Sequence, residues 1–511
     1  MSTRGLAPPA TLAAALADGL APDGGLYVPE SIEPWSRSDL ERLPSMSIAE
    51  IGARVLQPFA RDELSGSQVS ALVRDALDFP VPLVEIQPGV RALELFHGPT
   101  LAFKDIGARV MARLIAALDR GGEPATILVA TSGDTGSAVA HAFHGTGARV
   151  VVLYPEGRVS PTQEAQLTMF NTPDGRGNVR AFAIAGTFDD CQRLVKTAFA
   201  DRALRERVRL TSANSINLGR LLPQMIYYFT AGAGLQAGPV TETPVGAGLQ
   251  ASPVTETPVG AGLQASPVTE TPVGAGLQAS PVSETPVGAG LQASPVSETP
   301  VGAGLQAGPN VVVSVPSGNF GNLTAGLFAK RAGAPIERFV AATNVNDVVP
   351  AYLLSGVYTP RPSLTTLTNA MDVGNPSNFE RMRWLFRNDV AAMRSEVNGS
   401  VHTDAEVRAT IAQVYRERGY LLDPHSAIAY LGIVGRAGLG GRALGPRGEG
   451  EGIFLATAHP AKFREIVEPI IGRPVDLPEA LAAALARPLH RLPLAATPEA
   501  LGAALDASRH A

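Results

Sequence analysis

Cysteine is nearly absent from this sequence, which holds a single residue of that type, Cys191, in 511 positions. One cysteine excludes an intrachain disulfide and any Cys-x-x-Cys metal or redox motif, and it fits a reducing compartment. Long basic stretches are also missing, and the formal net charge is −5. A nucleic-acid partner is therefore not expected, because such partners require clustered positive charge.

Long apolar runs are missing as well. No segment approaches the roughly 18 consecutive apolar residues that a membrane span needs. The opening residues, MSTRGLAPP, lack the apolar stretch of a secretory signal. We expect a soluble, cytoplasmic protein with no membrane partner.

Several nucleotide and metal motifs are absent too. There is no G-x-G-x-x-G fingerprint and no P-loop with its Lys-Ser/Thr pair, which disfavours dinucleotides and nucleoside triphosphates. No H-E-x-x-H or paired His/Cys spacing occurs, so a metal site is not expected. His97, His425 and His459 stand in polar segments, and we interpret them as structural residues that cap turns.

The hydrophobic pattern divides the chain into three regions. Residues 1–85 have mainly helical periodicity, whereas 86–474 alternate apolar strands with helices, with a smaller subdomain at roughly 122–225. Continuous apolar strands between helices predict α/β architecture with a parallel sheet covered on both faces. An Ala- and Leu-rich tail, 475–511, is expected to be helical and peripheral. Strands are expected at 26–28, 125–131, 150–154, 179–184, 311–315, 339–343 and 452–457.

A 14-residue unit, GAGLQA(G/S)PV(T/S)ETPV, interrupts this pattern between 232 and 309. Each copy carries two prolines and at least two glycines, which a coiled coil does not tolerate. Too few apolar residues are present to offset the entropy of ordering. We interpret 232–309 as a disordered or polyproline-II-like insertion, either an inert surface loop or a segment that binds a partner or tethers an oligomer.

The segment GPTLAFKD (98–105) precedes a long helical pattern, so Lys104 is expected at a helix N-terminus. The helix dipole disfavours a cation there, and a partly desolvated amine with a lowered pKa can attack a carbonyl. Pyridoxal phosphate is an aldehyde of the matching kind. A surface lysine in the first turn of a helix is the alternative for this segment taken alone.

Two small polar loops follow strands and open helices. SGNFGN (317–322) can turn backbone N–H groups toward an anion, which indicates a phosphate cradle. SGDTG (132–136) is suited to a substrate carboxylate. Each loop alone also fits an ordinary turn with a helix cap, but both loops together with Lys104 favour a phosphorylated cofactor. Thr457 closes a strand, where its hydroxyl would either pack or face a pyridine nitrogen.

Nine ordered segments carry a resemblance to a known family: STRG (2–5), LADGLAPDGGLYVP (16–29), FHGPTLAFKD (96–105), ATSGDTG (130–136), NSIN (214–217), VPSGNFG (315–321), ATNVND (342–347), NAMDV (369–373) and TAHPAKF (457–463). Together they resemble the threonine synthases of the bacterial and fungal type. That family consists of fold-type II pyridoxal-phosphate enzymes, similar to the tryptophan synthase β chain. The repeat does not belong to the family pattern.

The resemblance implies a role for each matching residue. Lys104 would be the Schiff-base lysine, and Thr457 would meet the pyridine nitrogen. The cofactor phosphate would be held by Gly318, Asn319, Phe320, Gly321 and Asn322. The substrate would be bound by Ser132, Asp134, Thr135, Asn214, Ser215, Asn217 and Arg220, with the Arg220 fork at its phosphate.

The activity that the resemblance implies is the conversion of O-phospho-L-homoserine and water to L-threonine and phosphate, the last step of threonine biosynthesis. Such an enzyme is a carbon–oxygen lyase, and we expect a monomer or a homodimer. Two alternatives stay open. One is another fold-type II lyase acting on a related amino acid, and the other is a non-catalytic scaffold that uses the repeat.

Overall fold

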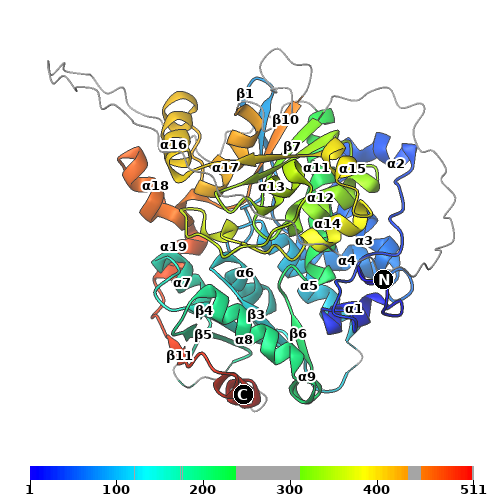
Figure 1. Cartoon of the computed structure of the whole chain (residues 1–511), viewed down its shortest axis with the longest axis vertical. Coiled ribbons are helices and arrows are strands. Elements are labelled where there is room, and N and C mark those ends of the chain that lie inside the picture. The colour runs from blue at the N-terminus through cyan, green and yellow to red at the C-terminus, as the bar shows by residue number, and fades with distance from the viewer. Residues whose placement is uncertain (120, 173, 175–176, 238–310, 436–450, 509–511) are drawn as a thin grey trace, which may run out of the picture. The chain divides into compact units, whose positions relative to one another are not determined.

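The computed structural model describes residues 1–119, 121–172, 174, 177–237, 311–435 and 451–508 (Figure 1). The first part is helical, as expected, with α1 Leu12–Asp18, α2 Arg37–Arg42, α3 Ile48–Ala60 and α4 Gly66–Ala76. Serine capping boxes start α3 and α4, which fixes both N-termini. The strand expected at 26–28 is wrong, because Tyr27 makes only an isolated bridge with Ser2.

The larger sheet has the order β1-β2-β10-β7-β8-β9. Its strands are β1 Leu83–Gln87, β2 Val90–Glu94, β7 Val311–Pro316, β8 Arg338–Thr343, β9 Val397–Val401 and β10 Glu451–Ala456. Every pair is parallel except β1 with β2. Val313 faces one apolar core and Val312 the other, so both faces of the sheet are covered, as the apolar strand runs predict.

The smaller sheet is parallel throughout and has the order β11-β5-β4-β3-β6. It contains β3 Thr126–Ala130, β4 Arg149–Pro155, β5 Val179–Ile184, β6 Leu210–Ser212 and β11 Leu492–Leu494. Residues 104–212, which contain β3 to β6, also form the helices α5 Lys104–Leu118, α6 Asp134–Phe143, α7 Pro161–Thr168, α8 Phe188–Ala200 and α9 Arg202–Val208.

The tail is not purely helical, which corrects the prediction for 475–511. Its β11 pairs with β5, and α20 Pro498–Ala507 buries Leu501 and Leu505 in the core shared with α8. In Figure 1 the orange and red tail runs beside the green β5. A three-residue Leu-Pro-Leu strand is too short to leave a periodic signal, and its proline is tolerated at the sheet edge. The predicted domain limits remain a prediction.

The remaining α-helices among the described residues are α10 Leu218–Leu221, α11 Met225–Ala237, α12 Gly321–Arg331, α13 Val348–Ser355, α14 Phe379–Leu385, α15 Val390–Glu396, α16 Asp404–Arg418, α17 Pro424–Val434, α18 Arg464–Ile471 and α19 Glu479–Leu485. Of these, α17 packs directly on β7, β8 and β10 of the larger sheet. Within the part of the chain that the model describes, no helix is long and apolar enough to cross a membrane.

The start of the repeat is helical, against the prediction for 232–309. The helix α11 continues through the first six residues of the first copy and ends at Ala237. Ala233 is buried, and a Cβ on Gly232 would lie 2.6 Å from Pro335, so close packing stabilises this turn. The rest of the predicted insertion, 238–309, lies outside the described residues.

Candidate active site

Lys104 is the first residue of α5, as predicted. The backbone just before Lys104 is hydrogen-bonded to the residues that follow β10. Phe103 N–H donates to Thr457 O at 2.9 Å, and His459 N–H donates to Leu101 O at 3.0 Å. Leu101 has a positive φ of 59°, which turns the chain into this pairing. The two family motifs around Lys104 and Thr457 are therefore one structural unit.

The contacts of Asp105 account for two further residues of the segment GPTLAFKD, Gly98 and Thr100. Its buried carboxylate accepts from Thr100 N–H at 2.9 Å and from Thr100 Oγ1 at 2.6 Å. A Cβ on Gly98 would lie 2.6 Å from Asp105 Oδ2, so only glycine fits there. Burial raises the pKa of Asp105, and the Thr100 bonds oppose that shift. The loop before α5 is thus closed onto the first turn of its own helix.

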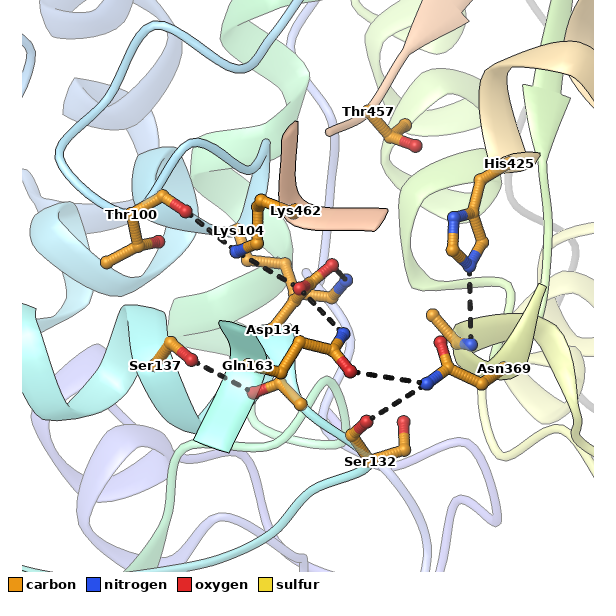
Figure 2. Close-up of polar contacts among 12 residues, drawn as sticks. Thr100, Lys104, Ser132, Asp134, Ser137, Gln163, Asn369, His425, Thr457 and Lys462 are labelled. Atoms are coloured by element: carbon orange, nitrogen blue, oxygen red, sulfur yellow. Dashed lines mark hydrogen bonds and ion pairs between the residues drawn. The ribbon is translucent and has the colours of Figure 1, made fainter. Parts of the chain in front are cut away.

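Lys104 faces a buried carboxylate and a second lysine. Its Nζ lies 3.3 Å from Asp134 Oδ2, and Lys462 Nζ lies 3.1 Å from Asp134 Oδ1 (Figure 2). Burial lowers the pKa of Lys104; Asp134 opposes this, and the cations of Lys462 and Arg220 add to it. The lowered pKa predicted for Lys104 thus has burial and nearby cations as its causes in the structure.

Asp134 keeps its charge in this setting. Burial alone would raise its pKa, but Lys462 and Lys104 outweigh burial and hold the pKa well below its usual range. Gln163 Nε2 also donates to Asp134 Oδ1 at 3.2 Å. Because the charged side chain of Asp134 would repel a second carboxylate, the structure gives no support to that side chain as a contact for the substrate carboxylate.

One cavity gathers almost all the predicted site residues. It is lined by Lys104, Ser132, Asp134, Thr135, Asn214, Ser215, Arg220, Gly318, Asn319, Phe320, Gly321, Asn322 and Thr457. Asn217 is absent from this lining. His425, for which the sequence indicates a structural role, also lines the cavity, and its Nδ1 lies 3.0 Å from Asp423 Oδ1.

The loop 317–322 has the form of an anion cradle. Phe320 adopts a positive φ of 59° and α12 begins at Gly321, so the unpaired N–H groups of the first turn face one end of the loop. Asn319 braces the loop, donating to Ser215 Oγ at 3.2 Å and accepting from Ser377 N–H at 2.7 Å. Asn322 receives the hydroxyls of Tyr227 and Tyr228 on Oδ1.

Two buried donors in this cavity have no partner among the described residues: Asn322 Nδ2 and Arg220 Nε. Orphaned buried donors cost free energy unless a ligand satisfies them. Both side chains are nine-tenths buried or more. The donor set therefore fits one or two phosphate groups.

In the loop 132–136, two backbone N–H groups are already bonded to the neighbouring Thr131 side chain. Thr131 Oγ1 accepts from the N–H groups of Gly133 and Gly136, each at 2.9 Å. Asp134 and Thr135 begin α6, so their N–H groups are the ones left for an anion. Asn214 Nδ2 donates to Ala130 O at 2.9 Å and so ties this strand end to its neighbour.

Asn217 has a structural position instead. Its Nδ2 donates to Leu16 O and Ser212 O, both at 2.9 Å, and its Oδ1 accepts from Gly219 N–H at the start of α10. We predict that Asn217→Ala lowers the free energy of unfolding by about 1–3 kcal/mol, because two buried carbonyls lose their donor. Denaturant unfolding measures this effect, and KM for the substrate is expected to stay constant. A large rise in KM with unchanged stability would restore the substrate role.

Sequence reasoning missed four residues in or beside the site: Lys462, Asn369, Gln163 and Asp372. Lys462 stood inside TAHPAKF and Asn369 inside NAMDV, so each was visible in a family motif without a role. Gln163 carried no signal; it links Asp134 to Asn369, whose Nδ2 lies 3.4 Å from Gln163 Oε1 (Figure 2). Asp372, also in NAMDV, lines the cavity, and burial raises its pKa to about 6.

In the described ranges, no group of three or more His, Cys, Asp or Glu side chains is placed so that it could hold a metal ion.

Comparison with known proteins identifies the family. Three family models match successive stretches: "Threonine synthase N terminus" over 1–77, "Pyridoxal-phosphate dependent enzyme" over 82–219, and "Threonine synthase, C-terminal" over 442–503. The threonine synthase of Serratia marcescens is 39% identical over 488 residues, which cover 94% of each chain.

Solved structures agree. The crystal structure of threonine synthase from Escherichia coli aligns with a TM-score of 0.77 at 37% identity, over 98% of this chain and 97% of that one. The structure of pyridoxal-phosphate-bound threonine synthase from Brucella melitensis aligns with a TM-score of 0.78 at 33% identity, over 100% and 99%. Because sequence models, whole-length identity and fold all agree, the chain belongs to the threonine synthase family, with the fold of the type II pyridoxal-phosphate enzymes.

Proposed function

We propose that this chain converts O-phospho-L-homoserine and water to L-threonine and phosphate, with pyridoxal 5′-phosphate as its cofactor and Lys104 as the lysine that holds it. The observation that carries the proposal is the meeting of the Lys104 amine with the 317–322 anion cradle in one cavity. An amine of lowered pKa and a phosphate cradle are the two features that an aldehyde phosphate requires.

The residues present fit that cofactor. The first N–H groups of α12 and the orphaned Asn322 Nδ2 would hold the phosphate. Gly318 admits the close packing, since a Cβ there would lie 2.5 Å from Ala370 O. Thr457, 6% exposed, lines the cavity and would present a neutral hydroxyl to the pyridine nitrogen. When bound, the cofactor supplies an electron sink for charge that develops at the substrate's Cα.

The chain's own residues move protons and orient groups. Lys104 Nζ, once released by the substrate amine, would remove the Cα proton and later return one, since it is the amine in the cavity lining. Arg220, with Nη1 fixed on Ala213 O at 2.7 Å and Nε without a partner among the described residues, would hold the substrate phosphate. Ser132 and Thr135 would orient the substrate's amino-acid end.

The test is a substrate assay on the purified protein loaded with pyridoxal phosphate. We expect O-phospho-L-homoserine to yield L-threonine and inorganic phosphate in equal amounts. If the protein instead forms 2-oxo acids from hydroxy-amino acids and leaves O-phospho-L-homoserine intact, the alternative of another fold-type II lyase is correct.

The repeat offers a test of the scaffold alternative. No candidate site residue lies between 238 and 309, so deletion of one complete copy, 260–273, is expected to leave kcat/KM unchanged within about twofold. Loop-closure entropy changes by only about 0.6 kcal/mol for each doubling of length, so Tm should move little. A protein that loses turnover with this deletion would contradict the assignment of catalysis to the remaining chain. A cytoplasmic location and a monomeric or homodimeric state remain sequence predictions.

A further inference from the structure

Two lysines share one carboxylate at the base of the cavity, and their surroundings differ sharply. The side chain of Lys104 is 15% exposed and lines the cavity, and Asp134 is its ionic partner. Lys462 is fully buried, and its Nζ also donates to Thr100 O at 2.7 Å. Figure 2 shows both lysines directed at Asp134. Lys462 is therefore fixed in place, whereas Lys104 is accessible to a ligand.

The same backbone pairing positions both amines. The bridge between Ala102 and Ala458 precedes each lysine by a few residues. After it, His459 caps a short 3-10 turn, accepting from Ala461 N–H on Nδ1, and that turn carries Lys462 toward Thr100. The backbone positions of the two lysines are therefore set by this one unit.

The local charge decides which lysine keeps its proton. The ammonium groups of Lys104 and Lys462 would share the Asp134 carboxylate, and the buried Arg220 also lies near Lys104. His425, on α17, also helps to lower the pKa of Asp134. The buried Asp105, on α5, interacts electrostatically with Lys462 and Arg220. A buried excess of positive charge is costly, and it is removed if one amine is neutral.

We propose that Lys462 is a positioning residue that serves as the lasting counter-ion of Asp134, so that Lys104 rests as a neutral amine ready to bind the cofactor. This inference rests on the proposed function and goes beyond it, because it gives the motif TAHPAKF a role in preparing the nucleophile. Condensation joins the amine nitrogen to the aldehyde carbon and releases the aldehyde oxygen as water. It needs the amine's lone pair, so an ammonium must first lose its proton.

The experiment follows the loading of the apoprotein with pyridoxal phosphate as a function of pH. Uptake is read from the absorbance of the bound cofactor, and borohydride reduction with peptide mass spectrometry identifies the modified lysine. The variants are Lys462→Met, Lys462→Arg, Asp134→Asn and the Asp134→Asn/Lys462→Met double variant. Ionisation of free pyridoxal phosphate affects all variants alike, so only differences between variants are interpreted.

We expect Lys462→Met to raise the pH midpoint of loading by about one unit, which makes loading roughly tenfold slower below both midpoints. Lys462→Arg should keep the wild-type midpoint, because it keeps the cation. The double variant should return toward wild type, since it removes the carboxylate that would otherwise hold Lys104 as an ammonium. A role in packing alone predicts no shift, and an unshifted midpoint in Lys462→Met would overturn the proposal.

If Lys462→Met does not fold, the comparison of Asp134→Asn with the double variant still decides the matter. There too, removal of the Lys462 cation should raise the midpoint, and equal midpoints would overturn the proposal. If a variant folds but fails to retain cofactor, the pH dependence of Lys104 acetylation by acetic anhydride gives the same midpoint. Wild-type protein that takes up no cofactor at Lys104 would instead contradict the proposed function.

Discussion

Replacement of Lys104 by alanine is expected to abolish the absorbance band of the bound cofactor and to lower turnover by at least about 1,000-fold. Lys104 is the lysine in the cavity lining and the first residue of α5, so alanine removes both the covalent anchor and the proton carrier. Lys462 cannot substitute for it, because its amine is fully buried and bonded to Asp134 and Thr100. Absorbance spectroscopy and steady-state assays measure the two losses.

The matched control is Lys196→Ala, which removes an exposed lysine of α8. It should retain the cofactor band and the wild-type turnover. Lys104→Arg separates charge from nucleophilicity: it keeps a cation near Asp134 but offers no amine, so it too should fail to load. Normal turnover in Lys104→Ala would remove the basis of the proposed chemistry.

Replacement of Gly318 by alanine is expected to weaken cofactor binding by roughly 10- to 100-fold. An added Cβ would lie 2.5 Å from Ala370 O and 2.9 Å from Met371 Cα, and both atoms belong to backbone that cannot rotate away. The loop must shift, which displaces the N–H groups that would meet the phosphate. Overpacking of this kind also costs about 1–3 kcal/mol of stability. Equilibrium titration with pyridoxal phosphate measures the affinity.

Gly502→Ala in α20 provides the control, because a Cβ there would meet nothing within 4 Å. This variant should bind cofactor like the wild type and, as an alanine in a helix, should be no less stable. If Gly318→Ala binds the cofactor with unchanged affinity, the phosphate does not lie in the 317–322 loop.

The fold was largely predictable where the sequence is periodic. The six strands that were predicted lie inside the two sheets and are mostly apolar, because both faces of each sheet are buried, and so β3, β4, β5, β7, β8 and β10 stand where they were predicted. Pyridoxal phosphate as the cofactor is confirmed by the family model over 82–219. Of the strands that were not predicted, β1, β6, β9 and β11 lie at sheet edges, and β2 forms an antiparallel pair with β1. For β11, pairing with β5 and not local preference decides the conformation.

Candidate site residues could be named from the sequence where one continuous loop carries the whole pattern. Gly318 and Gly321 lie in a strand–loop–helix junction, and such a junction can be recognised from sequence. The link between Asp134 and Lys462 joins α6 to the turn after β10, far apart in the chain, and only tertiary structure brings them together. Asn217 shows the reverse case: its motif NSIN lines the cavity through Asn214 and Ser215, while Asn217 itself points into the protein at Leu16.

The most direct measurement of the central claim is the position of the cofactor on the chain. Purified protein is loaded with pyridoxal phosphate, reduced with borohydride, digested and mapped by mass spectrometry. The structure predicts one modified peptide, carrying the reduced cofactor on Lys104, and loss of that modification when O-phospho-L-homoserine is added before reduction. Modification at Lys462 or at an exposed lysine such as Lys196, with Lys104 unmodified, would contradict the account.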